Sequence, residues 1–173
     1  AVVGKFGLPD VISQEGTRAQ ERFIEFFAAT IRNKNTRLAY ARAVGVFLAW
    51  CEKKKLSLTG IRPIHVAAYI ETHKGSAQTC KQHLAAIRML FDYLVIGQVV
   101  PHNPAASVRG PKHVVKKGKT PVLKASQARQ LLDSIDTSTI VGLRDRAIIA
   151  TMVYSFARVG AVVAMNKEDY FQN

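Results

Sequence analysis

Apolar side chains recur every three to four residues along most of this chain, and that spacing predicts α-helices. Two stripes are long enough to define a buried helix face: Tyr40, Val44, Phe47, Leu48 and Cys51, then Cys80, Leu84, Ile87, Phe91 and Leu94. Signals for strands are nearly missing, because Val99-Val100 and Val114-Val115 are too short to count. The sequence therefore predicts a mostly α fold.

Capping residues and breaks set the expected limits of the helices. Asn35, or Thr36 beside it, is expected to cap the second helix, Pro63 fits the first turn of the third, and Ser76 can cap the fourth. Ser138 or Thr139 is expected to start the long helix near the end of the chain. The predicted helices span residues 15–31, 36–54, 63–72, 77–96 and 126–135, then one from 138 or 139 and one that opens at Arg158.

A change in composition divides the chain. The segment Pro101-His102-Asn103-Pro104 stops the fourth helix. Residues 108–121 contain glycine and proline, no acidic residue and five cations, which is typical of an interdomain linker. We expect an N-terminal arm at 1–13, a helical domain at 14–105, a basic linker at 106–121 and a second helical unit at 122–173.

The charge of the chain points to a polyanionic partner. The net charge is +13 and the pI is near 10.1, an excess that favours nucleic acid first and an acidic membrane surface second. No apolar run reaches transmembrane length, and the first residues lack the apolar core of a signal peptide. Cys51 and Cys80 are expected to be reduced core thiols, and the five histidines show no spacing for zinc, so no metal or cofactor is expected.

One arginine stands between two apolar segments near the end of the chain. Residues 147–157 are apolar enough to predict a helix buried on all sides, and Arg158 follows directly. A guanidinium at the edge of a core needs an anion. A structural ion pair with Asp145 or Asp169 would satisfy it, and so would a bound phosphate; the residues alone leave both open.

The stretch GLRDRAIIATMVYSFARVGAVVAMNKEDY resembles the segment around the first catalytic arginine of the tyrosine recombinases, the phage integrase family. Arg158 falls on that arginine. Phe156 stands where the family usually has glycine, and Ala161 where it usually has an acid that helps to order the site. Earlier stretches, NTRLAYARAVGVFLAWCEKKKL and SAQTCKQHLAAIRMLFDYLVIGQVVPHNPA, are similar to the family's core-binding domain, so the resemblance runs collinearly from Phe23 to Asp169.

The resemblance implies a four-helix, SAM-like core-binding domain, a basic linker and the first helices of a truncated catalytic domain. In this family the two domains clamp duplex DNA, and a tyrosine attacks a phosphodiester to form a phosphotyrosyl bond without metal or cofactor. Two arginines hold the phosphate oxygens, and their planar forks match the developing charge. The chain is then a fragment with only the first catalytic residue, Arg158. It is expected to be inactive alone, although the parent is an enzyme.

Cations and amides outside the apolar stripes are the expected contacts to double-stranded DNA, although the same residues also suit any solvated helix face. They are Arg37, Arg42, Gln78, Lys81, Gln82, Arg88, Arg109, Lys112, Lys116, Lys117 and Lys119. The resemblance implies a cytoplasmic prokaryotic or mobile-element protein whose parent assembles on DNA as a tetrameric synapse. Two other functions stay open: a non-catalytic helical DNA-binding accessory protein, and a helical protein-interaction module.

Overall fold

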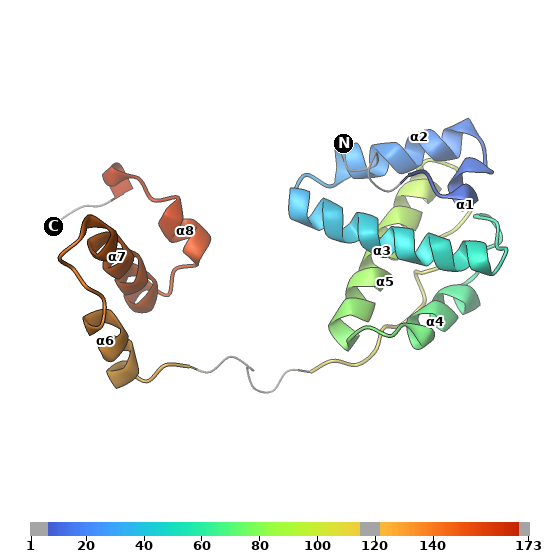
Figure 1. Ribbon diagram of the computed structural model, residues 1–173. Helices are drawn as coiled ribbons and strands as arrows, with labels where there is room; N and C mark the ends of the chain where they lie inside the picture. Colours follow the sequence, from blue (N-terminus) through green and yellow to red (C-terminus); the bar gives the residue numbers. More distant parts are fainter. Residues whose placement is uncertain (1–6, 115–121, 170–173) are drawn as a thin grey trace. The chain divides into compact units, whose positions relative to one another are not determined.

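The computed structural model describes residues 7–114 and 122–169, which belong to two compact units, Ala1–Val114 and Val115–Asn173 (Figure 1). Within those described ranges every regular element is a helix and no strand occurs. The mostly α fold predicted from the apolar spacing is therefore confirmed.

The first unit contains six helical elements. In order they are α1 (Asp10–Ser13), α2 (Thr17–Glu25), the π-helical turn η2 (Phe26–Thr30), α3 (Lys34–Lys53), α4 (Pro63–Thr72) and α5 (Ala77–Ile96). The helix expected over 15–31 is thus an α-helix whose last turn widens. This turn still buries the apolar face of the prediction, because Phe26 is 0 % and Phe27 3 % exposed.

Side-chain caps explain where α3 and α5 begin. The Asn33 side-chain oxygen accepts hydrogen bonds from the backbone nitrogens of Asn35 (2.9 Å) and Thr36 (3.2 Å), so it satisfies two free amides of the first turn. The expected cap at Asn35 or Thr36 was therefore wrong, and α3 starts one residue after Asn33. Ser76 caps α5 as predicted, since its Oγ accepts from the Thr79 nitrogen at 3.2 Å.

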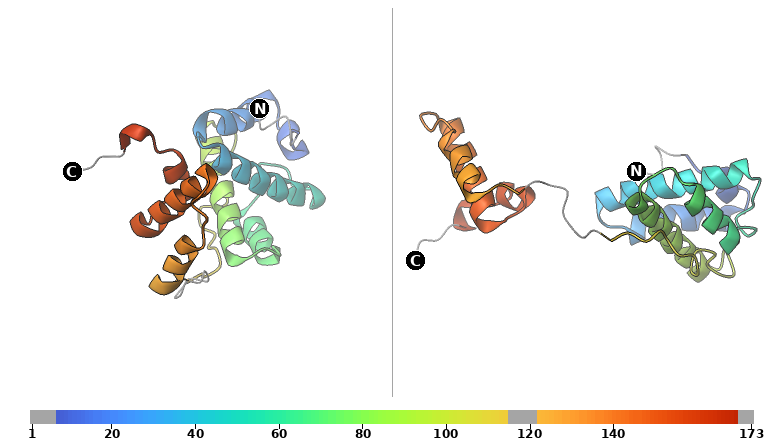
Figure 2. Two further views of the ribbon diagram at one scale, coloured as in Figure 1. Left: turned by 60° about the vertical axis from the view of Figure 1, so that its left-hand side comes forward. Right: turned by 90° about the horizontal axis from the view of Figure 1, so that it is seen from below.

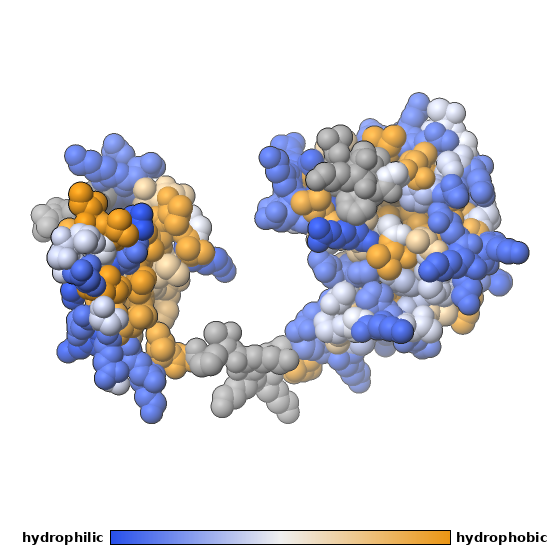
Figure 3. All heavy atoms as spheres, in the orientation of Figure 1, coloured by the Kyte–Doolittle hydropathy of each residue, from blue (hydrophilic) through white to orange (hydrophobic). Residues whose placement is uncertain are grey.

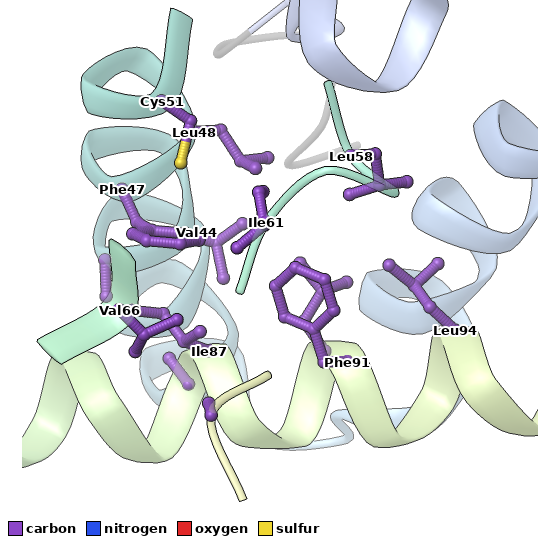
Figure 4. Close-up of a cluster of buried hydrophobic side chains, with 14 of the residues drawn as sticks. Val44, Phe47, Leu48, Cys51, Leu58, Ile61, Val66, Ile87, Phe91 and Leu94 are labelled. Atoms are coloured by element: carbon purple, nitrogen blue, oxygen red, sulfur yellow. The ribbon is translucent and has the colours of Figure 1, made fainter. Parts of the chain in front are cut away.

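The core of the first unit lies where α3 passes across α5 (Figures 1 and 2). Figure 4 shows the side chains that meet there, which come from both helices, from α4 and from the loop before α4. Both apolar stripes identified in the sequence supply this core, and Phe47, Ile87 and Phe91 are 0 % exposed. The helical spacing of the sequence therefore identified the buried faces of α3 and α5 correctly.

The structure revises both ends of the first unit. Val11 and Ile12 of α1 are 3 % and 0 % exposed and belong to the core, so residues 10–13 are not part of an irregular arm. At the other end Ala105 (0 %) and Val108 (7 %) also pack in the core. The segment predicted as a linker over 106–121 is therefore packed at least as far as Val108, because its apolar residues fill the surface of the helical unit.

The second unit contains α6 (Ala125–Asp133), α7 (Ile140–Ser155), α8 (Val159–Val163) and the 3₁₀ turn η3 (Lys167–Asp169). Thr139 caps α7, as one of the two predicted caps, by accepting from the Gly142 nitrogen at 3.1 Å. A β-carbon at Gly142 would stand 1.6 Å from the Asp136 carbonyl oxygen. This position therefore requires glycine, because the loop before α7 lies directly against it.

The prediction that the apolar helix near the end of the chain is buried on all sides was wrong for the described residues. Within residues 147–157, Tyr154 is 73 % and Phe156 92 % exposed, and earlier in α7 Ile140 is 86 % exposed. The neighbouring helices α6 and α8 have nine and five residues and cover only part of the sixteen-residue α7. Figure 3 shows the apolar side chains gathered on the visible face of the second unit. A surface of this kind is typical of a site that binds another protein element.

Candidate nucleic-acid interface

The outward face of α5 presents amides and a cation to solvent. Gln78, Lys81 and Gln82 are exposed, while Cys80 and Leu84 on the opposite side are 5 % and 2 % exposed. Burial of the apolar stripe fixes the rotation of the helix, so these three polar residues are held outward. Lys81 has no carboxylate partner among the described residues.

The segment that follows α5 returns to the same face. A β-carbon on Gly110 would stand 3.5 Å from Cγ of Lys81 and 3.4 Å from Cδ2 of Leu84, so the backbone at Gly110 lies against α5. Its neighbours Arg109 and Lys112 are exposed. The structure thereby brings together five predicted DNA-binding residues, which we call the α5 surface: Gln78, Lys81, Gln82, Arg109 and Lys112.

Arg88 has a different position from the one its sequence context suggested. Its Nε donates to the Ala105 carbonyl at 3.0 Å, and its Nη2 donates to the Val108 carbonyl. The guanidinium is half-buried and occupied by backbone oxygens. In this structure Arg88 therefore holds the segment after α5 in place, and it acts on the α5 surface by positioning Arg109 and Gly110.

Asn103 completes this attachment, a role that the sequence pattern did not predict. Its Nδ2 donates to the Arg88 carbonyl (3.0 Å) and to the Asp92 carboxylate (2.7 Å), while its Oδ1 accepts from the Ala105 nitrogen (2.8 Å). The motif Pro-His-Asn-Pro was interpreted only as a helix stop. The available signal was an amide between two prolines, a place where Asn side chains commonly bond to nearby backbone.

We expect Arg88→Ala to open this attachment without unfolding the core. Two hydrogen bonds from a charged donor would be lost, which together stabilise the segment by about 1.5–3 kcal/mol or more. Trypsin cleavage after Arg109, and hydrogen exchange over 103–109, should both accelerate by tenfold or more. The matched control is Arg129→Ala in α6, an exposed arginine of the second unit. Unchanged cleavage after Arg109 in Arg88→Ala would contradict the positioning role.

Two other predicted DNA contacts lie away from the α5 surface. The Arg37 guanidinium donates to the Ile31 carbonyl from Nε (2.8 Å) and Nη2 (2.6 Å), which ties the start of α3 to the end of η2. Arg42 is exposed and borders an apolar groove with Phe23 and Phe27. Neither residue joins the α5 surface. Lys116, Lys117 and Lys119 lie outside the described residues.

Arg158 stands at the start of α8 in the second unit. Its carbonyl accepts from the Ala161 and Val162 nitrogens at 2.8 and 3.2 Å, and its side chain is exposed. Within 122–169 it forms no ion pair: Asp145 is held by Arg144 at 2.7 Å, and Asp169 accepts from the Asn166 nitrogen. The structural ion pair weighed in the sequence analysis is therefore not formed among these residues.

The turn before Arg158 has a backbone conformation that favours glycine. Phe156 has φ 54° and ψ 21°, a left-handed conformation that costs roughly 1–2 kcal/mol for residues other than glycine. Its ring is 92 % exposed, so packing does not offset that cost. The phenylalanine keeps the left-handed turn that places Arg158 at the start of α8.

Three of the five histidines form local contacts. His65 and His73 accept from the nitrogens of Arg62 (3.1 Å) and Gly75 (2.9 Å), and His83 Nδ1 lies 2.7 Å from the Tyr69 hydroxyl. Burial, and then the nearby His73, lower the pKa of His83. No group of three or more His, Cys, Asp or Glu suited to a metal ion occurs in the described parts of the chain.

The thiols are both free and buried, and burial raises the pKa of Cys51 to about 12. The burial of both side chains matches the prediction that they belong to the core. Among the described residues, no helix is long and apolar enough to cross a membrane.

Comparisons with known proteins agree with this arrangement. Residues 21–97 match the family model described as "Phage integrase, N-terminal SAM-like domain". The chain is 28 % identical to "Tyrosine recombinase XerD" of Listeria monocytogenes over 141 residues, which cover 78 % of this chain and 46 % of the relative. It is 33 % identical to "Tyrosine recombinase XerC" of Chlamydia pneumoniae over 107 residues, 62 % of this chain and 33 % of the relative.

A third relative, "Tyrosine recombinase XerC" of Leptospira interrogans, is 25 % identical over 165 residues, which cover 91 % of this chain and 52 % of that protein. That match is too long to fit in the first unit and therefore includes much of the second. The chain spans between a third and about half of the length of these relatives. From the SAM-like domain and this collinear similarity, the chain belongs to the tyrosine recombinases of the phage integrase family.

Proposed function

We propose that this chain is the DNA-binding part of a site-specific DNA recombinase, with the first unit as the core-binding domain and the second as the start of the catalytic domain. The observation that carries the proposal is the α5 surface. It is built on the helix that ends the matched SAM-like domain, and it presents three cations and two amides together. Duplex DNA is the polyanion that such a basic and amide-bearing helix face fits.

The charge distribution along the chain supports the proposal. No acidic residue occurs between Asp92 and Asp133, while this interval contains both Arg109 and Lys112 of the α5 surface. A basic region without acids has no internal counter-charge, so it attracts phosphates and releases their counterions on binding. A protein-interaction module has no comparable need for a segment of this length without acids.

Arg158 is the proposed first catalytic residue. An exposed guanidinium without an ion-pair partner in its unit is available to donate two parallel hydrogen bonds to the oxygens of a scissile phosphate. As in the rest of the family, the complete enzyme would then transfer the phosphodiester to a tyrosine, and a synapse of four copies would exchange the strands. The described residues contribute the arginine to this reaction and the grip on the duplex.

A salt titration tests the duplex-binding step. The equilibrium constant for a labelled random duplex is expected to fall steeply with salt, with a slope that grows by roughly 0.9 for each neutralised phosphate. Lys81→Ala and Lys112→Ala should each reduce that slope by about 0.9. Fluorescence anisotropy at several salt concentrations measures it.

Lys53→Ala is the control for this titration, because it removes the same charge from the end of α3. It should leave the duplex slope unchanged. A wild-type slope near zero would refute duplex binding by the chain, and equal slopes for wild type and Lys81→Ala would remove the α5 surface from the proposal.

A non-catalytic DNA-binding protein of the same family is the second candidate. Ala161, which is exposed one turn into α8, replaces the acid that usually helps to order the recombinase site. An inactive member would bind duplex DNA with the same salt dependence. The complete protein should be incubated with a nicked DNA substrate and analysed on a denaturing gel: a covalent DNA–protein band supports the recombinase, and its absence supports the second candidate.

A further inference from the structure

Two open hollows lie between the C-terminal part of α3 and α4. No residue of the α5 surface lines either of them. One, of about 420 Å³, is lined by Trp50, Lys53, Tyr69, His73 and Lys74 among others. The second, of about 630 Å³, is lined by Trp50, Lys54, His65 and Thr72 together with two apolar residues. Both volumes are in the range of ligand-binding pockets, about 300–1,000 Å³. Trp50 and Thr72 line both hollows, so they form the ridge between them.

The first hollow has an aromatic floor. The Trp50 and Tyr69 rings lie 5.7 Å apart between centroids and are inclined at 65°. Trp50 is partly exposed, while Tyr69 is 3 % exposed and is held by Phe47 at 5.0 Å and by its hydroxyl contact to His83. Tyr69 is thus fixed in the core and Trp50 reaches solvent. The Trp50 ring therefore offers the stacking surface for a planar ligand, and Tyr69 supports that ring from the core side.

The rim is cationic. Lys53 and Lys74 border the first hollow and Lys54 the second, where its Nζ lies 6.0 Å from the centre of the Trp50 ring. None of these three lysines is paired with a carboxylate within the part of the chain that the structure describes. No acidic residue lines either hollow. The site therefore combines uncompensated positive charge with a flat aromatic surface.

These features fit an unpaired nucleotide better than any other anionic ligand. Single-stranded nucleic acid is bound by cations that follow the phosphates and by aromatic rings on which the bases stack. A base in a duplex cannot stack in this way, because its neighbours cover both of its faces. An acidic peptide would satisfy the lysines, but it has no matching requirement for the Trp50–Tyr69 floor.

We propose that the hollow between the ends of α3 and α4 is a subsite for single-stranded DNA, in which a base stacks on Trp50 and Lys53 and Lys74 hold the flanking phosphates. This subsite goes beyond the duplex contact of the proposed function and rests on it only in taking DNA as the polyanion. It also gives a role to Lys53 of the Lys53-Lys54-Lys55 triplet, which the α5 surface does not use.

The chain contains a single tryptophan, so its fluorescence reports on this site alone. Titration with a short oligothymidylate is expected to quench Trp50 emission, because a stacked base quenches indole. Trp50→Leu keeps an apolar side chain but loses the stacking surface. It should weaken binding of a labelled oligothymidylate about fivefold to a hundredfold in anisotropy. Circular dichroism should confirm that the variant is folded.

Paired lysine variants separate this subsite from the duplex site. Lys53→Ala and Lys74→Ala should each weaken oligothymidylate binding and reduce its salt slope by roughly 0.7, the value for single strands. Lys81→Ala is the matched control and should leave the Trp50 quenching curve unchanged. In duplex titrations Lys81→Ala should reduce the salt slope, while Lys53→Ala and Lys74→Ala should leave it unchanged.

Three results would overturn the proposal: no change in Trp50 emission when anisotropy shows the oligothymidylate bound, identical quenching curves for Lys53→Ala and wild type, or quenching by a poly-glutamate peptide with none by the oligonucleotide. Each of these leaves the duplex result of Lys81→Ala intact. Conversely, loss of duplex binding with normal quenching would refute the proposed function and spare the subsite.

Discussion

Replacement of Arg158 by lysine in the complete recombinase is expected to slow DNA strand cleavage about a hundred- to a thousandfold, the usual cost of losing a transition-state donor. Lysine keeps the positive charge but cannot donate two parallel hydrogen bonds to the phosphate oxygens. Cleavage of a nicked DNA substrate under single-turnover conditions measures the effect, because the covalent intermediate then accumulates.

Loss of the Arg158 guanidinium should hardly affect folding. Arg158 is exposed and forms no ion pair within 122–169, so its loss leaves no buried acid unpaired. Thermal melting of Arg158→Ala in this chain should match that of wild type within a few degrees.

Arg144→Lys is the matched control for both measurements. Arg144 lies in the same unit and forms an exposed pair with Asp145, which contributes little to stability. It should cleave DNA normally. A large loss of melting temperature in Arg158→Ala, with cleavage unchanged in the complete enzyme, would assign Arg158 to structure and contradict the proposed mechanism.

Truncation of Phe91 is expected to produce the largest loss of stability in the first unit. The ring is 0 % exposed and lies 6.4 Å from that of Phe47 at a steep angle, in the contact between α3 and α5 (Figure 4). Phe91→Ala leaves a cavity that the rigid pair of helices cannot close, so the free energy of unfolding should fall by about 3–5 kcal/mol.

Urea unfolding followed by Trp50 fluorescence measures this loss, because Trp50 lies in the first unit and is the only tryptophan of the chain. Phe156→Ala provides the control. It makes the same chemical change at a ring that is 92 % exposed in the second unit, so the midpoint seen by Trp50 should not move. A loss below about 1 kcal/mol in Phe91→Ala would contradict the central place of this ring in the core.

The periodic placement of apolar residues determined the helices and the inward faces of α3 and α5. Local chemistry was sufficient to predict these features. Pro63 and Ser76 set the starts of α4 and α5 through effects within one helical turn, and an apolar stripe is buried whichever element packs on it. The resemblance in the second unit located Arg158 in the same way, by a motif that is continuous in sequence. The family, the mostly α fold and the free thiols therefore followed from the sequence.

Contacts between distant segments decided the rest. Nothing local distinguishes Arg88, which is tied to Ala105 and Val108, from Lys81, which is free on the same helix. The helical period gives both residues a polar position, but only the return of the chain after α5 shows which of them meets backbone carbonyls. For the same reason the sequence could not place Val11, Ile12 and Val108 in the core.

The exposure of α7 and the hollow at Trp50 are also properties of the tertiary structure. An apolar sequence predicts that a helix will be covered, but the extent of cover depends on the lengths of α6 and α8 and on how they pack. Likewise the Lys53-Lys54-Lys55 triplet looks like a solvated helix end until α4 places Tyr69 and the turn after it places Lys74 beside Trp50. The helical periodicity and the charge of each segment can be read from the local sequence. The contacts between charged and aromatic side chains depend instead on how helices that are far apart in the chain pack together.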